Sequence, residues 1–236
     1  HAMISTNNVL INAHMLEASH INGVQRYFYS SSACIYPQGA QLDADVTPLK
    51  ESDAYPADPE EGYGWEKLYS EKLCEYYSND YGLETRVARF HNVYGLLGTY
   101  DGGREKAPAA LCRKIALAKD GDEIEIWGDG LQTRSFMFID DCLEGIIRLT
   151  AADHREPLNL GSDELISING LFDLITEVSG KSIGKYHDLT KPQGVRGRNS
   201  DNSKLLEVLN YVPGTTMAEG ISPTYSWIAS QVNGSA

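Results

Sequence analysis

Four side chains in two short segments could move protons to and from a hydroxyl or carbonyl group. Ser32 and Cys34 follow an apolar segment, and Tyr63 and Lys67 form a Tyr-x-x-x-Lys pattern. This spacing places Tyr63 and Lys67 on one face of a helix, one turn apart. Because an ammonium stabilises a phenolate, we expect Lys67 to lower the pKa of Tyr63 from its usual value of about 10. Ser32 is expected to hydrogen-bond the oxygen that Tyr63 acts on.

The composition limits the classes of protein to which the chain can belong. The chain has 236 residues, of which 42% are hydrophobic and 22% charged, as in ordinary globular proteins. Its net charge of -13 argues against nucleic acid or an anionic membrane as the main partner. No apolar run is long enough to span a membrane, and no signal pattern is present. We therefore expect a cytoplasmic protein with no membrane partner. The cysteines are widely spaced and no metal-ligand pattern occurs, so we expect neither disulfides nor a metal site.

Helices and strands alternate around these segments. The apolar spacing predicts a helix over 6–22, a strand over 24–30, a helix over 63–81 closed by Gly82, and a strand over 84–90. This series is typical of the back half of a doubly wound, Rossmann-like α/β domain with a parallel sheet, which we place at residues 3–95.

The pattern becomes less regular after residue 95. It predicts helices over 107–119, 140–151 and 168–179, strands over 123–127, 157–161 and 183–188, and two C-terminal helices. We assign residues 96–232 to a second, smaller α/β domain that binds the substrate.

The phosphate-binding turn of a complete Rossmann domain does not occur in this sequence. That turn is Gly-rich, follows the first strand, and precedes an acidic ribose-binding residue by about 20 positions. Gly95–Gly98 is too short, and Gly128–Gly130 fits an ordinary turn. We therefore expect a truncated sheet in which strand 24–30 has an open edge and exposes Val24, Tyr27, Phe28 and Tyr29. Such an edge favours a homo-oligomer, or a partner chain that supplies the missing half.

Longer motifs carry a family resemblance. Arg89–Gly95 and Gly128–Phe136 are similar to segments of the extended short-chain dehydrogenases/reductases that modify nucleotide sugars, the NAD-dependent epimerases and dehydratases. Three more specific motifs are Ser32–Pro37, Gly102–Pro108 and Gly194–Asn202. Through these motifs, residues 4–230 resemble the GDP-mannose 3,5-epimerases within that family.

The resemblance implies a reaction and roles for the side chains. Tyr63 would deprotonate the C4 hydroxyl of a GDP-sugar while a hydride passes to NAD, which makes the C3 and C5 protons of the 4-keto sugar acidic. Cys34 and Lys106 would then act as the acid and base on opposite faces of the ring. We expect burial and mutual proximity to lower the pKa of both from about 8.5 and 10.4. The same NADH would reduce the keto group.

The resemblance also assigns binding residues. Tyr63 and Lys67 would contact the nicotinamide end of NAD, and Arg196 and Arg198 would pair with the diphosphate of the substrate. Further expected substrate contacts are Asn92, Glu105, Lys114 and Gln132. Without the phosphate-binding turn, we expect the isolated chain to bind NAD weakly and its activity to be impaired.

Other interpretations of these residues stay open. Cys34 could be a small packed side chain, Lys106 a solvated charge, and His91 a packed residue beside the site. The chain could be a non-catalytic module that binds a sugar nucleotide or helps assembly. It could also be a related 4-epimerase, 4,6-dehydratase or decarboxylase, although those reactions do not need a Cys/Lys pair.

Overall fold

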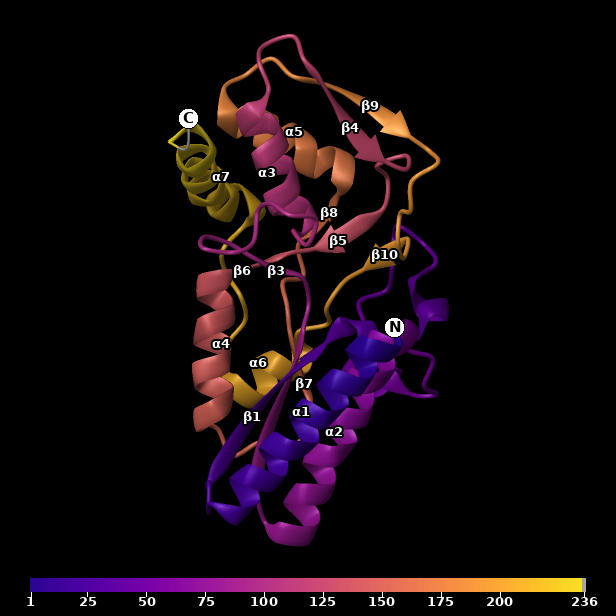
Figure 1. The fold of residues 1–236 in the computed structure, drawn as a ribbon, viewed down its shortest axis with the longest axis vertical. Coiled ribbons are helices and arrows are strands. Elements are labelled where there is room, and N and C mark those ends of the chain that lie inside the picture. The colour runs from indigo at the N-terminus through magenta and orange to yellow at the C-terminus, as the bar shows by residue number, and fades with distance from the viewer. Residues whose placement is uncertain (235–236) are drawn as a thin grey trace.

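A computed structural model describes residues 1–234 of the chain. Figure 1 shows an elongated molecule. At one end lie α1 (Ala2–Ile21), α2 (Glu61–Tyr81) and β1 (Arg26–Ser32), and at the other end lie α3 (Ala107–Leu117), α5 (Ile168–Ser179) and α7 (Met217–Asn233). The first of these parts is built on a parallel sheet with the strand order β1-β2-β7. Its strands are β1 (Arg26–Ser32), β2 (Glu84–Phe90) and β7 (Leu158–Leu160).

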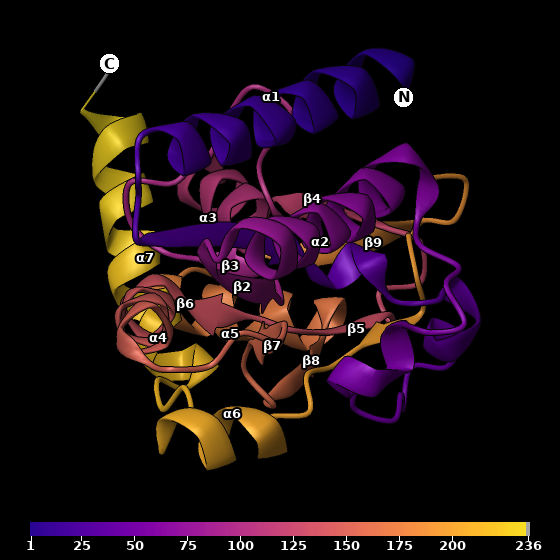
Figure 2. The same cartoon turned by 90° about the horizontal axis from the view of Figure 1, so that it is seen from below.

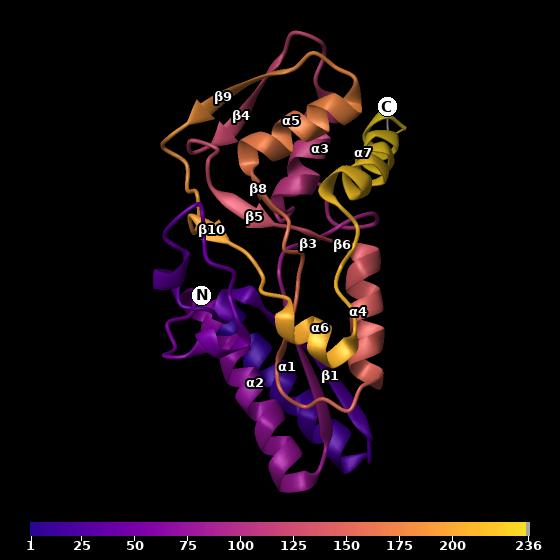
Figure 3. The same cartoon turned by 180° about the vertical axis from the view of Figure 1, so that it is seen from behind.

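Helices cover both faces of this sheet. The helices α1 (Ala2–Ile21) and α2 (Glu61–Tyr81) run side by side and pack on one face through Leu16, Tyr29 and Val87. The helices α4 (Ile139–Ala151) and α6 (Ser203–Leu209) lie on the other face, as Figures 2 and 3 show from below and behind. They pack there around Ala88 and Phe28. Successive strand residues point to opposite faces, which explains this division. The fold is therefore α/β with helices on both faces of a parallel sheet, as predicted.

Several predicted boundaries differ from the structure. Strand 84–90 and the end of α2 at Tyr81 are confirmed, with Gly82 in the left-handed conformation at φ 73°. The first helix begins at Ala2 instead of residue 6 and ends at Ile21, so that Asn22 is its C-cap. The first strand begins at Arg26 instead of residue 24, because residues 22–25 form the turn out of α1.

The expected exposure of the first strand is only partly correct. Tyr29 is 3% exposed, because α1 and α2 cover that face of the sheet. Tyr27 and Phe28 are half-buried, and Val24 is exposed but lies before the strand. Within residues 1–234, however, β1 has no neighbour on its second edge.

The second part packs around a separate apolar core. The helices α3 (Ala107–Leu117), α5 (Ile168–Ser179) and α7 (Met217–Asn233) enclose Ile115, Leu171 and Ile221. Two parallel strands, β4 (Glu123–Trp127) and β9 (Gly184–Asp188), lie beside them. Lys181 holds the end of α3 by donating hydrogen bonds to the carbonyl oxygens of Ile115, Ala116 and Ala118 at 2.9, 2.7 and 2.7 Å.

The structure also contains short elements that the sequence did not predict. They are the strands β3 (Val93–Tyr94), β5 (Thr133–Ser135), β6 (Met137–Phe138), β8 (Leu165–Ser167) and β10 (Gly197–Arg198), and the 3₁₀ helices Ala33–Ile35, Gln38–Gln41 and Glu51–Ala54. β3 pairs with β6, and β5 lies between β10 and β8. Because α4, β7 and α6 return to the first part, the two parts interleave along the chain, and the boundary near residue 95 stays a prediction. None of the helices in residues 1–234 combines the length and apolarity that a membrane crossing needs.

Candidate active site

The candidate site lies where β1 ends and α2 begins. Ser32 is the last residue of β1, and Cys34 lies in the 3₁₀ helix that follows it. The Ser32 hydroxyl caps this turn by accepting a hydrogen bond from the Cys34 backbone N–H at 3.2 Å. The Cys34 carbonyl accepts a hydrogen bond from the backbone N–H of Glu60 at 3.0 Å. These contacts bring the first turn of α2, and with it Tyr63, next to the segment that carries Ser32 and Cys34.

Tyr63 and Lys67 lie on one face of α2, as their spacing predicted, but their electrostatics differ from the expectation. Partial burial raises the pKa of Tyr63, and a hydrogen bond with the Ser32 hydroxyl opposes this shift. Partial burial lowers the pKa of Lys67. The Lys67 ammonium donates to the carbonyl oxygen of Ser30 at 2.9 Å and lies 5.7 Å from the centre of the Tyr63 ring. The predicted lowering of the Tyr63 pKa is therefore wrong for this structure, because desolvation has the larger effect.

Cys34 is the one cysteine of the four in the chain that is not buried, and an arginine contacts it. The guanidinium Nη1 of Arg198 lies 3.6 Å from the Cys34 thiol. Arg198 also donates to the side chain of Gln41 at 2.6 Å and forms an ion pair with Glu60. Arg198, which we expected at the diphosphate, is thus a buried neighbour of the thiol.

Arg134 is a further residue of the site that the sequence analysis did not single out. Burial lowers its pKa to about 10, and its electrostatic interaction with Cys34 opposes that shift. It donates to the carbonyl oxygens of Thr133 and Val195 at 2.7 and 2.6 Å. The motif Gly128–Phe136 contained the signal that could have identified Arg134, because it includes this arginine in a segment that resembles those of sugar-nucleotide enzymes.

Arg196 lies on the neighbouring turn and is more open to solvent. Its Nη1 donates to Asp129 at 2.8 Å and to Gln193 at 3.2 Å, and its side chain is 30% exposed. This interaction lowers the pKa of Asp129. A partly exposed guanidinium beside a glycine-bounded turn could exchange the carboxylate of Asp129 for a phosphate group.

Lys106 does not have the predicted environment. It is exposed at the start of α3, and no hydrogen bond or ion pair within the described chain joins its ammonium to Cys34 or to another group. The expected burial is therefore wrong, because the loop before α3 lies on the surface. Its neighbour Glu105 is more enclosed: one carboxylate oxygen accepts from Arg113 at 3.3 Å, and the other is buried without a protein partner.

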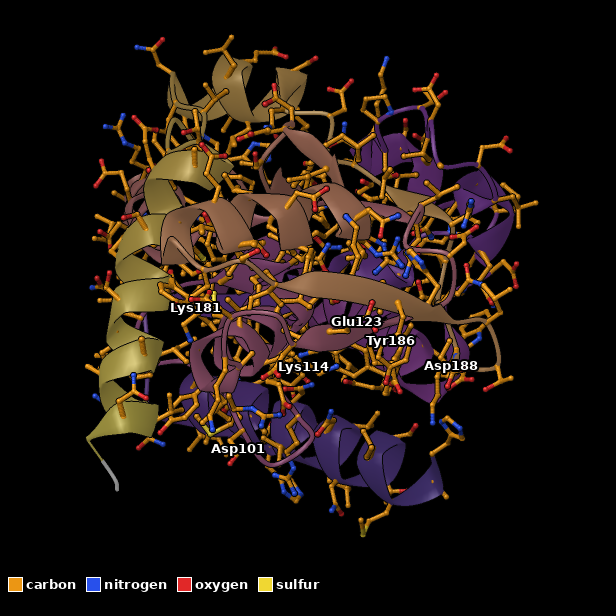
Figure 4. All side chains as sticks on the ribbon, turned by 90° about the horizontal axis from the view of Figure 1, so that it is seen from above. Asp101, Lys114, Glu123, Lys181, Tyr186 and Asp188 are labelled. Atoms are coloured by element: carbon orange, nitrogen blue, oxygen red, sulfur yellow. The ribbon has the colours of Figure 1, made fainter. Side chains whose placement is uncertain are left out.

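The other expected substrate residues occupy separate elements. Asn92 adopts a positive φ of 43° after β2 and donates to the carbonyl oxygen of Ser135 at 3.1 Å. Gln132 donates to the carbonyl oxygen of Trp127 at 3.1 Å, while its own side-chain oxygen is buried without a partner. Lys114 donates to the carbonyl oxygen of Glu125 at 3.2 Å, and Figure 4 shows it on α3, near the strands of Glu123 and Tyr186. Roles for these three residues stay predictions.

The sequence of the chain is similar to those of known proteins. The sequence model of the NAD dependent epimerase/dehydratase family matches residues 2–161, and the chain belongs to that family. The chain is 51% identical to GDP-mannose 3,5-epimerase of Arabidopsis thaliana over 98% of its own length and 61% of the relative. It is 53% identical to GDP-mannose 3,5-epimerase 1 of Oryza sativa subsp. indica over 98% of its own length and 60% of the relative. The chain thus spans about three fifths of these curated relatives.

Solved structures share the fold. UDP-glucose 4-epimerase of Thermotoga maritima, solved with UDP-glucose, superimposes with a TM-score of 0.88 at 25% identity, covering 98% of this chain and 72% of that one. UDP-glucuronic acid 4-epimerase of Bacillus cereus, solved with UDP-glucuronic acid and NAD, gives a TM-score of 0.81 at 26% identity, covering 95% and 68%. These likenesses agree with the α/β fold.

Proposed function

We propose that this chain carries the catalytic and substrate-binding part of a GDP-mannose 3,5-epimerase. The observation that carries the proposal is the meeting of Ser32, Cys34 and Tyr63 at the end of β1. It is supported by identities of 51% and 53% to proteins of that name. A 4-epimerase or dehydratase does not need a Cys/Lys pair, whereas a partly exposed Cys34 beside Arg198 suits an additional proton transfer at carbon.

The proposed chemistry has two stages. In the first, Tyr63 accepts the proton of the C4 hydroxyl as a phenolate, which a nearby positive charge must stabilise because burial raises its pKa, and the Ser32 hydroxyl holds Tyr63 in place. In the second, Cys34 removes or returns a proton on one face of the 4-keto sugar. Lys106 acts on the opposite face at C3 and C5. Its exposed position requires that the loop before α3 brings the ammonium to the sugar when substrate binds.

The residues at the site fit the nicotinamide end of NAD. The ammonium of Lys67 has three donors, and the hydrogen bonds of the described chain use one of them, at Ser30. The remaining donors would hold ribose hydroxyls, while Tyr63 lies on the same helix face. NAD, when bound, would accept a hydride from C4 of the sugar and return it. Weak binding of NAD by the chain alone stays a prediction, which a micromolar affinity in calorimetric titration would contradict.

Solvent exchange tests the proposed function. The chain is incubated with NAD and GDP-mannose in deuterium oxide, and deuterium at C3 and C5 is measured by NMR. With NAD in large excess, which offsets its weak binding, we expect slow incorporation in the wild type, none in Tyr63→Phe, and strong suppression in Cys34→Ala. Cys142→Ala is the matched control, since this buried thiol lies on α4 away from the site. GDP-mannose binding without exchange in the wild type would instead support the non-catalytic module.

A second proposal concerns partners. β1 offers an unpaired edge within the described sheet, and apolar side chains of α1 are exposed. We propose that a second copy of the chain covers these surfaces. A different chain that pairs with the edge of β1 is the alternative, and measurement of the mass of the assembly in solution distinguishes the two.

A further inference from the structure

A buried ion pair lies directly behind the candidate site. Arg89 on β2 and Glu71 on α2 have side chains that are each 4% exposed. The Arg89 guanidinium donates to the Glu71 carboxylate with Nη2 at 2.8 Å and with Nε at 3.0 Å, which is a bidentate arrangement. Its Nη1 donates to the carbonyl oxygen of Glu51 at 2.8 Å and to the hydroxyl of Tyr36 at 3.2 Å. Arg89, on β2, therefore joins α2, the 3₁₀ helix that begins at Glu51, and Tyr36 at the end of the 3₁₀ helix Ala33–Ile35.

A second set of hydrogen bonds extends this ion pair across the sheet. The Tyr36 hydroxyl donates to the side-chain oxygen of Asn159 at 2.6 Å, and the His91 Nε2 approaches the same oxygen at 3.1 Å. The Asn159 amide donates to the carbonyl oxygen of Leu49 at 2.8 Å. Tyr36, His91 and Asn159 are all fully buried. The network thus reaches from α2 to the middle of β7.

The network holds both halves of the candidate site. Glu71 follows Lys67 by one helical turn and Tyr63 by two, so the three side chains lie on one face of α2. Ser31 donates its hydroxyl to Glu71, and Tyr36 donates to Asn159. Ser31 and Tyr36 flank the segment that carries Ser32 and Cys34. The position of Tyr63 relative to Cys34 therefore depends on the groups that Arg89 connects.

We propose that Arg89 is a positioning residue of the active site, which fixes α2 and its Tyr63 relative to the segment of Cys34. This inference rests on the proposed function. Arg89 touches neither catalytic side chain and acts through Glu71 and Tyr36. Its planar fork of donors matches the carboxylate, the hydroxyl and the carbonyl at once, which a lysine ammonium cannot do.

A role in positioning differs from a role in stability. A buried ion pair contributes little to stability relative to well-packed apolar side chains of similar size, whereas loss of one partner leaves an uncompensated charge. The pair Arg89→Met and Glu71→Leu should therefore fold. It should not restore the contacts to Ser31 and Tyr36, so the site should stay misaligned.

Two measurements on the full chain test the proposal. The first compares the change in kcat with the change in the dissociation constant for GDP-mannose. The second is the rate at which iodoacetamide alkylates Cys34 at fixed pH. This rate reports on Cys34 because Cys74, Cys112 and Cys142 are buried. Arg86→Lys is the matched control, since Arg86 is a buried arginine of the same strand that binds Glu84 and the carbonyl oxygen of Ala152 at its other end.

We expect Arg89→Lys to lower kcat by about 10- to 100-fold, as for a displacement of about 1 Å at a reacting centre, and to leave GDP-mannose affinity almost unchanged. Cys34 alkylation should become several-fold faster, because its segment is less firmly held. The double variant should show the same lower kcat and faster alkylation, and its melting temperature should equal that of the wild type. Arg86→Lys should change neither kcat relative to affinity nor the alkylation rate.

The outcomes separate this inference from the proposed function. Alkylation needs no turnover, so it decides the role of Arg89 even if the wild type does not act on GDP-mannose, which would contradict the proposed function alone. A folded Arg89→Lys variant, or a folded double variant, with wild-type alkylation of Cys34 would overturn the positioning role.

Discussion

Gly64 lies directly against the carbonyl group of Cys34. A Cβ atom at position 64 would overlap the Cys34 carbonyl oxygen and would lie 2.8 Å from the Cβ of Pro59. The first turn of α2 can reach the end of β1 because this position has no side chain. Since Tyr63 is the neighbouring residue, the glycine sets how closely the phenol approaches Cys34.

Gly64→Ala should therefore separate α2 from the Cys34 segment. Backbone and Pro59 cannot yield as a flexible side chain would, so we expect a loss of about 1–3 kcal/mol in the free energy of unfolding. We also expect at least about a tenfold lower kcat through misalignment. Gly39→Ala is the control, because nothing lies within 4 Å of its Cβ position. Urea unfolding and the deuterium exchange assay measure the effects, and equal values for the two variants would argue against the close approach.

Replacement of Arg196 and replacement of Arg198 should have different effects on GDP binding. Arg196→Ala removes a partly exposed guanidinium, and we expect GDP affinity to fall by an amount on the order of 1.5–3 kcal/mol if the diphosphate replaces Asp129 as its partner. Arg198→Ala should mainly change Cys34 alkylation and stability, because it leaves Glu60 without its ion-pair partner. Arg148→Ala, which breaks an exposed pair with Glu144, is the control. Unchanged GDP affinity in Arg196→Ala would show that the diphosphate binds elsewhere.

His91 should make the protein sensitive to acid. Burial lowers its pKa from 6.5 to about 4, so the folded protein favours the neutral imidazole. The unfolded chain binds the proton more readily between these two values, and stability therefore falls as the pH drops below about 6.5. We expect His91 to account for about 2 kcal/mol of the loss between pH 7 and pH 5. Urea unfolding of the wild type and of His91→Gln at both pH values tests this, and an equal loss in the two proteins would contradict it.

The sequence was most informative where a periodic pattern was long. The helix that ends at Tyr81 and strand 84–90 have enough residues to show their period and a glycine at the boundary, so their predicted limits match α2 and β2 closely. The two-residue strands β3 and β10 are too short to show a period, and their partners are distant in the chain.

The environment of the site depends on contacts between residues that are far apart in the sequence, and no local sequence pattern predicts such contacts. Residue type and spacing identify Tyr63, Lys67 and Ser32, and the family resemblance identifies Cys34. The structure brings Ser32, Cys34 and Tyr63 together. Arg198, however, approaches Cys34 from a distant part of the chain, and Lys106 is exposed because its loop does not fold over the site. The pKa of Tyr63 likewise depends on how much of the phenol the fold desolvates, which spacing on a helix does not determine.

Self-association should involve the outer face of α1. Ile4, Ile11 and Met15 share one face of this helix and are 51%, 58% and 51% exposed. Within α1 the side chain of Glu17 is the one acidic group, and Lys and Arg are absent, so charge repulsion there is small despite the net charge of the chain. On α2, Trp65, Tyr69 and Tyr76 are each 51% exposed and also share a face. Burial of such side chains stabilises an interface by about 1.5–3 kcal/mol for each one fully buried.

We therefore expect a dimer at micromolar concentration, measured by light scattering or sedimentation. The double variant Ile11→Glu and Met15→Glu should be monomeric, because two carboxylates would face their counterparts across the interface. Leu189→Glu is the control, since Leu189 is 70% exposed but follows β9 in the other part of the molecule. If the wild type is a stable monomer, α1 is not an interface. If the double variant remains dimeric, the open edge of β1 becomes the surface that joins the two copies.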